Sequence, residues 1–196
     1  ARLGLRSALV TNLGADENGR DCLAELRKNN VITDYAKVHK NKATNYHFVL
    51  WYGADRTILV NHIAYDYMLP RLEPPPKWLY LTSLGTNTFP YHVAIADYLD
   101  ANPGVKLAFQ PGTFQMKLGS NELKRIYSRA DAFIVNVEEA QRILKMDSNS
   151  ADTSRDIKVL LKGLADLGAK LVIITDNTRG GYMFDGDHYY FVPMYP

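Results

Sequence analysis

The chain has 196 residues, of which 46% are hydrophobic and 22% charged, and its formal net charge is +2. These values are typical of globular domains, so they exclude disordered, collagen-like and coiled-coil proteins, and the length suffices for one domain with a sizeable core. A small charge of mixed sign predicts no nucleic-acid partner. The apolar run at residues 171–174 is far too short to cross a bilayer, which predicts no membrane association.

The chain contains a single cysteine, Cys22, which excludes an internal disulfide. This cysteine usage is typical of a reducing compartment, so we expect a cytoplasmic protein. Cys22 lies on the apolar side of a predicted helix, and we expect it to be buried rather than reactive. The five histidines show no pair at zinc-ligand spacing, which predicts no zinc site.

The chain begins with an apolar run at residues 7–10, which predicts a strand entering a turn at residues 11–14. A helix is predicted from Asp16 or Gly19 to Lys28 because its apolar residues recur at helical spacing. Acidic residues lie early in this segment and basic residues late, as the helix dipole favours.

Two segments rich in aromatic and β-branched residues, 44–52 and 56–62, predict a β-hairpin because Gly53-Ala54-Asp55 separates them. The aromatic run in the first segment is typical of hairpin packing. Asn45 and His47 alternate with part of that run, so they could instead face a cleft.

After Pro74-Pro75-Pro76, which fits neither a helix nor a central strand, strands alternate with helices. The predicted strands are residues 78–81, 106–109, 132–135 and 170–175, and the predicted helices are residues 91–102, 123–129, 138–145 and 156–167. This alternation is typical of βαβ units with a parallel sheet. Residues 181–192 predict an antiparallel hairpin at a sheet edge, so the whole chain predicts an α/β sandwich with an early inserted hairpin.

Ligands of open α/β sheets bind at the carboxyl ends of the strands, so the residues that follow each strand are candidates for chemistry. Asn136 and Glu139 follow one predicted strand and would lie on one face of the next helical turn. There they could hold a hydrated divalent cation. The same spacing is close to a capping box, which needs no ligand, and both interpretations stay open.

Residues 175–181 follow the next predicted strand and combine small polar residues with Gly180 and Gly181. Such a loop can bring backbone N–H groups close to a phosphate or a nucleotide ring, but an ordinary strand-to-hairpin turn explains it equally well. The chain contains no Gly-x-Gly-x-x-Gly, Walker A or Gly-x-Ser-x-Gly pattern. A dinucleotide site, a P-loop and an α/β-hydrolase are therefore disfavoured.

Taken in chain order, these segments resemble the ribokinase-like (PfkB) family of sugar kinases over essentially all 196 residues. Residues 14–19 are similar to the family's Gly-x-Asp-x-x-Gly turn. Residues 44–62 fall where these enzymes carry a β-lid that closes over the sugar. Residues 136–140 match the Asn-x-x-Glu motif, which organises magnesium and phosphate, and residues 175–180 match the nucleotide loop.

The resemblance implies a three-layer α/β/α sandwich with a mainly parallel sheet: one incomplete domain over residues 1–196, with the lid at residues 44–62. It implies transfer of the γ-phosphoryl group of ATP to a hydroxymethyl group of a sugar or sugar-like substrate, with magnesium. The implied cofactor-binding residues are Asn136, Glu139, Thr175, Asn177 and Gly180, with Glu139 at the metal, and the implied substrate residues are Asn45, His47 and Gln110.

The chain also departs from the family pattern. Residues 110–115 replace a segment that is usually acidic or contains Asn, and Asn177 stands where Gly is common. The family's first strand and its Gly-Ala-Gly-Asp motif, which supplies the catalytic base, are expected before Ala1 and beyond Pro196. We therefore assign no catalytic residue and expect a central fragment that by itself transfers phosphate poorly or not at all.

Two other classes of function are weighed against a kinase. A non-catalytic sugar- or nucleotide-binding or dimerisation module could use the same fold. A glycosyl- or nucleotidyltransferase would need a metal-binding acidic pair at a strand end, for which Asp131 and Asp176 are the loose candidates. A homodimer through the hairpin is a further hypothesis, because an unpaired strand edge invites pairing with a second subunit.

Overall fold

The computed structural model describes residues 1–53, 55–146 and 156–195, so Ala54, residues 147–155 and Pro196 lie outside the description. The chain divides after Pro70 into two compact units, called the first and the second unit below.

The first unit contains two small parallel strand pairs and one helix in its described residues. Strand β1 (Ser7–Ala8) pairs with β3 (Val31–Ile32), and β2 (Thr11–Gly14) pairs with β4 (Ala36–His39). Helix α1 (Glu17–Lys28) follows β2 and confirms the predicted helix. The turn predicted at the residues of β2 is wrong, because these residues form a ladder with a distant segment.

Cys22 is exposed, so the prediction of a buried thiol is wrong. Leu23 and Leu26 of α1 are only half-buried, and Gly19 is the buried residue of the helix. The helix packs on β2 and β3, which are two to four residues long. The sheet surface that α1 packs against in this unit is therefore too small to bury Cys22.

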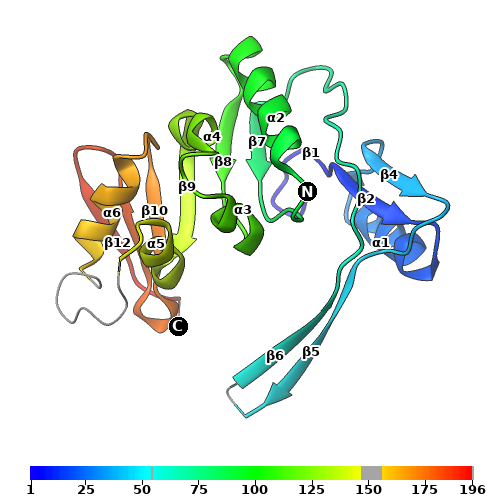
Figure 1. Ribbon diagram of the computed structural model, residues 1–196, viewed down its shortest axis with the longest axis horizontal. Coiled ribbons are helices and arrows are strands. Elements are labelled where there is room, and N and C mark those ends of the chain that lie inside the picture. The colour runs from blue at the N-terminus through cyan, green and yellow to red at the C-terminus, as the bar shows by residue number, and fades with distance from the viewer. Residues whose placement is uncertain (54, 147–155, 196) are drawn as a thin grey trace. The chain divides into compact units, whose positions relative to one another are not determined.

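The first unit also carries the predicted hairpin, formed by β5 (Tyr46–Tyr52) and β6 (Asp55–Asn61). Its antiparallel register runs from Tyr46 opposite Asn61 to Tyr52 opposite Asp55, and the ribbon extends as a long arm (Figure 1). Every residue of β5 is exposed. Successive residues of a strand point to opposite faces, so this arm presents apolar side chains on both of its faces.

The second unit is built on a six-stranded sheet with the order β12-β11-β10-β9-β8-β7. Its parallel strands are β7 (Trp78–Leu81), β8 (Lys106–Phe109), β9 (Ala130–Asn136) and β10 (Val172–Thr175), followed by the antiparallel strands β11 (Gly181–Phe184) and β12 (Tyr189–Val192). The sheet confirms the predicted parallel core and the edge hairpin.

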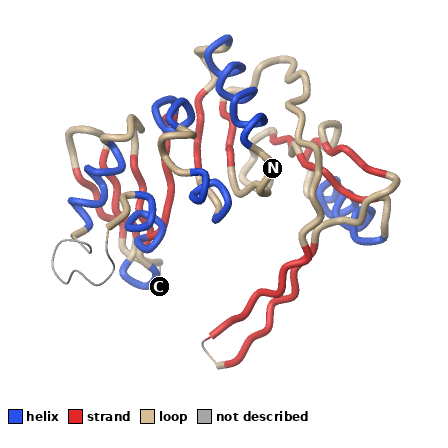
Figure 2. The backbone as a smooth tube through the Cα atoms, in the orientation of Figure 1, coloured by secondary structure: helices blue, strands red, loops and turns tan. Residues whose placement is uncertain are grey.

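Helices connect the parallel strands, as Figure 2 shows in blue against the red strands. They are α2 (Phe89–Ala101), α3 (Thr113–Leu118), α4 (Lys124–Arg129), α5 (Val137–Ile143) and α6 (Ile157–Ala165). The short helix α3 was not predicted from the sequence; the other four lie within the predicted helical ranges or extend them by a few residues at one end.

The core of the second unit lies between one face of the sheet and its helices. Phe109 of β8 and Phe133 of β9 contact Tyr127 of α4, with ring centroids 5.1–5.7 Å apart, and all three side chains are buried. On the other face Trp78 and Tyr80 are exposed. The helix-covered face therefore holds the close packing that fixes the strand ends.

Replacing Phe133 with Ala is expected to lower the free energy of unfolding by about 3–5 kcal/mol, because it leaves a cavity in this aromatic cluster. Phe191→Ala is the matched control, since Phe191 of β12 is 55% exposed, and its cost should be about 1 kcal/mol or less. Urea unfolding of both variants measures the difference. Equal costs would contradict the placement of the core.

Candidate functional site

Asn136 and Glu139 form a reciprocal capping box where β9 passes into α5. The Asn136 Oδ1 atom accepts a hydrogen bond from the Glu139 backbone N–H at 2.8 Å, and the Glu139 Oε2 atom accepts one from the Asn136 N–H at 2.9 Å. Both residues are half-buried. The predicted capping interaction is confirmed, and it holds two oxygen-bearing side chains together at the strand end.

The sheet register brings the two predicted cofactor segments together. Thr175, the last residue of β10, lies directly opposite Asn136 in the parallel pair of β9 and β10. The Thr175 hydroxyl donates to the Val135 carbonyl at 3.5 Å. The Asn136–Glu139 turn and the loop after Thr175 therefore occupy adjacent strand ends at one edge of the sheet.

The loop after β10 is held by its own side chains. Arg179 donates to the two carboxylate oxygens of Asp176, from Nε at 2.6 Å and from Nη2 at 2.8 Å. The Asp176 N–H bonds to the Gly180 carbonyl at 2.8 Å. This ion pair raises the pKa of the Arg179 guanidinium, chiefly through the side-chain hydrogen bond to Asp176, so the arginine remains charged.

Two residues of this loop have left-handed backbone conformations. Asn177 has a φ of 48°, which Asn tolerates better than most residues, so it can stand where Gly is common. Gly180 has a φ of 105°, and a Cβ atom there would lie 2.4 Å from the Val192 carbonyl oxygen. The loop therefore requires glycine at residue 180.

The predicted substrate residues already have partners or lie in the hairpin. Gln110, directly after β8, accepts a hydrogen bond from the Tyr80 hydroxyl through its carboxamide oxygen. Asn45, at the root of the hairpin, bonds through its carboxamide to the backbone of Ile63. His47 lies exposed on β5. Asn45 and His47 belong to the first unit and Gln110 to the second.

Sequence reasoning missed a buried polar network at the ends of β7 and β8. Gln115 is fully buried, and its amide donates to His92 Nε2 at 3.0 Å and to the Thr82 carbonyl at 3.2 Å. Its carboxamide oxygen accepts the Gly112 N–H at 2.8 Å. The His92 Nδ1–H donates to the Thr88 carbonyl at 2.7 Å, so the network ties together two strand-end loops.

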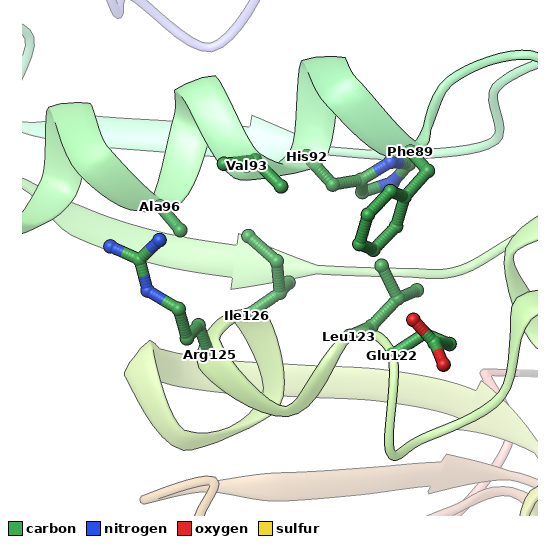
Figure 3. A pocket seen from close by; sticks show the side chains of 8 residues that line it. All are labelled: Phe89, His92, Val93, Ala96, Glu122, Leu123, Arg125 and Ile126. Carbon is green, nitrogen blue, oxygen red and sulfur yellow. The ribbon is translucent and has the colours of Figure 1, made fainter.

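Burial lowers the pKa of His92, which favours the neutral ring that this network requires. His92 also lines a cavity of about 30 Å³ between α2 and α4, together with Phe89 and Leu123 (Figure 3). A cavity of this volume holds about two water molecules. It is therefore too small for a sugar or a nucleotide, and His92 acts here as a structural group.

The acidic pair proposed for a transferase is not present. Asp131 lies at the start of β9, where it binds Lys170 at 2.8 Å and Arg129 at 3.2 Å. Asp176 follows the end of β10, and because β9 and β10 are parallel the two carboxylates lie at opposite edges of the sheet. Across residues 1–53, 55–146 and 156–195, no group of three or more His, Cys, Asp or Glu side chains could hold a metal ion.

Comparison with known proteins establishes the family of this chain. The model of the pfkB family of carbohydrate kinases matches residues 1–196. The chain belongs to the pfkB family. It is 24% identical over 197 residues to an uncharacterized sugar kinase of Archaeoglobus fulgidus, which covers 95% of this chain and 73% of that protein.

Several solved structures share the fold of this chain. The Halothermothrix orenii fructokinase has a TM-score of 0.74 at 24% identity, over 99% of this chain and 70% of the fructokinase. A PfkB protein from Polaromonas sp. JS666 has a TM-score of 0.74 at 17% identity, over 100% of this chain and 69% of that one. These likenesses confirm the predicted ribokinase-like α/β fold.

A putative ribokinase II from E. coli in complex with ATP and Mg²⁺ has a TM-score of 0.71 at 16% identity, over 100% of this chain and 64% of that one. In the described part of the present chain, no helix is both long enough and apolar enough to cross a membrane. At the level of the family, the chain is a carbohydrate kinase.

The buried His92 is expected to make the second unit less stable in acid. Because its pKa in the folded state lies below the ordinary 6.5, the unfolded chain binds more protons between the two values. The contribution of His92 to the unfolding free energy should therefore be constant above about pH 7 and fall as the pH drops through 6.5 toward the lowered pKa.

Urea unfolding at pH 7.5 and 5.5 measures this loss, followed by the fluorescence of Trp78 in a Trp51→Phe background. His92→Gln should reduce the difference between the two pH values. His188→Gln is the matched control, since His188 is exposed, and it should keep the parent's pH dependence. An unchanged pH dependence in His92→Gln would show that His92 is not the group responsible.

Proposed function

We propose that the protein transfers the γ-phosphoryl group of ATP, with magnesium, to a hydroxymethyl group of a sugar or sugar-like alcohol. The observation that carries this proposal is the adjacency of the Asn136–Glu139 turn and the loop at residues 175–180 in a carbohydrate kinase family member. An E. coli relative of the same fold is known in complex with ATP and Mg²⁺, and a Vibrio cholerae fructokinase with fructose, ADP and calcium.

The residues at this edge suit a magnesium ion and phosphates. Glu139 and Asn136 offer carboxylate and carboxamide oxygens, the hard ligands that Mg²⁺ prefers, and Mg²⁺ takes few protein ligands because it keeps several waters. When bound, magnesium neutralises charge on the phosphates of ATP. We propose that Glu139 binds the water molecules around the metal. Asn136 orients Glu139 through the two hydrogen bonds of the capping box.

The nucleotide would lie along the loop after β10. Thr175, Asn177 and Gly180 shape this loop, and its backbone passes through left-handed conformations at Asn177 and Gly180. The Asp176–Arg179 ion pair keeps the loop in one conformation before ligand arrives. Such preorganisation lowers the entropy that binding would otherwise cost.

Residues from each unit are assigned to the sugar: Asn45 and His47 of the first unit and Gln110 of the second. Because the Tyr80 hydroxyl binds the carboxamide oxygen of Gln110, the amide N–H₂ group is the part of Gln110 that would donate to a sugar hydroxyl. His47 can contribute from β5, whereas Asn45 contributes mainly by shaping the hairpin root. Covering the sugar with the hairpin would exclude water and so prevent ATP hydrolysis.

We infer that both units belong to one ribokinase-like domain, since the family model spans both. The base that takes the proton of the sugar hydroxyl is not assigned to any residue of this chain. We therefore expect residues 1–196 alone to transfer phosphate poorly or not at all. A coupled Mg-ATP assay with pentoses, hexoses and nucleosides tests this, and rapid turnover by these residues alone would contradict it.

In the full-length protein, Glu139→Gln is expected to lower kcat by roughly ten- to a thousandfold because it weakens charge stabilisation. Gln still fits the capping box, so the unfolding free energy should change little. The matched control is Glu138→Gln, which removes an equal charge from the neighbouring exposed residue and should keep kcat within about threefold. An unchanged kcat in Glu139→Gln would show that this pair only caps α5. The alternative function, a non-catalytic module, would instead bind sugar or nucleotide in calorimetry without any turnover.

We also propose a homodimer through the hairpin. A two-stranded ribbon is marginally stable by itself, yet β5 and β6 present Phe48, Leu50 and Leu59 on one face and Val49, Ile58 and Val60 on the other, all exposed. A second copy would remove part of this apolar surface from water.

Light scattering is expected to give the mass of a dimer for the parent protein and of a monomer for Leu50→Lys, which places a charge on the apolar arm. Phe191→Lys is the matched control, because it charges an exposed apolar residue of β12 instead, and it should remain dimeric. A monomeric parent at working concentration would contradict the dimer.

A further inference from the structure

Gln115 of α3 is a fully buried side chain that joins two loops at the carboxyl edge of the sheet in the second unit. Its Nε2 atom donates at 3.2 Å to the carbonyl of Thr82, in the loop after β7. Its Oε1 atom accepts at 2.8 Å the N–H of Gly112, in the loop after β8. Its second N–H donates at 3.0 Å to Nε2 of His92 on α2. The carboxamide thus uses both of its groups to tie one loop to the other.

The direction of each hydrogen bond in this cluster is fixed by a backbone group. The Thr88 carbonyl can only accept, so Nδ1 of His92 carries the ring proton and Nε2 is an acceptor. The Thr82 carbonyl also only accepts, whereas the Gly112 N–H only donates. Two acceptors and one donor therefore surround Gln115, and a neutral carboxamide, with two N–H donors and one oxygen, satisfies all three.

The two loops also touch directly at Gly112. A Cβ atom there would collide with the side chain of Ser83, so the loop after β8 can lie this close only with glycine at residue 112. Two residues earlier, the Gln110 N–H donates to the Leu81 carbonyl at 2.9 Å. The backbone of residues 110–112 is therefore held at its start by the end of β7 and at its end by Gln115.

We propose that Gln115 is a positioning residue for Gln110, the residue of the second unit that is assigned to the sugar. Gln115 fixes the backbone on which Gln110 lies, and the Tyr80 hydroxyl then orients the Gln110 carboxamide. This role rests on the proposed kinase function, since that function assigns the sugar to Gln110. The hydrogen-bonded link between the two loops does not depend on it.

The order of the strands determines which substrate the link affects. Gln115 joins the loops after β7 and β8, whereas the residues assigned to ATP and magnesium follow β9 and β10. A loosened link therefore displaces the sugar contact and leaves the cofactor contacts in place. A small displacement of a positioned group is enough to weaken its interaction with a substrate.

The first test replaces Gln115 with Met in the full-length protein, because methionine is similar in length but supplies neither the two donors nor the strong acceptor. In a coupled Mg-ATP assay with pentoses, hexoses and nucleosides, the KM of the sugar should rise roughly three- to tenfold, the size of one neutral hydrogen bond. The KM of ATP should stay within about twofold. An unchanged KM of the sugar, or an equal rise in both values, would overturn the proposal.

His92→Leu is a second variant that removes one of the three hydrogen bonds of Gln115. It should raise the KM of the sugar by less than Gln115→Met does. The double variant should resemble Gln115→Met alone, because both substitutions act through one network. If urea unfolding shows that Gln115→Met does not fold, His92→Leu still decides the result, and an unchanged KM of the sugar in that variant would overturn the proposal.

A matched control separates positioning from a general loss of stability. Asp131 is a largely buried polar group at the opposite edge of the same sheet, where it accepts the Leu107 N–H at 2.9 Å and the Lys170 ammonium at 2.8 Å. Asp131→Ala should lower the urea midpoint and leave the KM of both substrates within about twofold. A rise in the KM of the sugar equal to that of Gln115→Met would show that destabilisation alone explains the effect, and would overturn the proposal.

Hydrogen exchange of the Gly112 N–H tests the link without any activity. NMR should show this amide protected in the parent, and its exchange should be at least about tenfold faster in Gln115→Met, because its acceptor is lost. The same exchange rate in both proteins would overturn the link, even in an active kinase. A protein that phosphorylates none of the sugars or nucleosides would instead contradict the kinase function, while the exchange rates would still decide the link.

Discussion

The parallel pairing of β9 with β10 is the constraint on which the arrangement of the candidate site depends. Parallel strands cannot be joined by a tight turn, so a helical crossover must link them, and their carboxyl ends must meet at the same edge. That pairing places Thr175 opposite Asn136 and sends Asp131 to the other edge. Backbone pairing alone thus brings the two candidate cofactor segments together and keeps Asp131 apart from Asp176.

Much of the second unit could be predicted because its signals are local. The apolar strands and the helices between them are marked by periodicity, and the edge hairpin is marked by Asp185-Gly186-Asp187. In the first unit the pairing of β2 with β4 depends on a partner more than twenty residues away along the chain. There Gly14 looks like a turn residue, yet it is required because the Lys42 carbonyl lies so close.

In the candidate site, too, only the contacts between residues close along the chain could be predicted. The Asn136–Glu139 pair spans one helical turn, so spacing alone predicts that the two side chains meet. The partner of Gln110 is Tyr80, and that of His92 is Gln115, and neither pair is close along the chain. A side chain that seems available for substrate can therefore be held by a residue that only the fold brings near. The exposure of Cys22 could not be predicted for a similar reason. The spacing of apolar residues in a helix does not specify how much of a sheet the helix will cover.

The root of the hairpin is held by backbone groups, glycines and two small polar side chains, whereas the outward-facing residues of β5 and β6 take no part in that attachment. Substitutions along the arm can therefore change its chemistry without removing the hydrogen bonds at its root. Such a separation allows selectivity for a new ligand to evolve on the ribbon at little cost to folding.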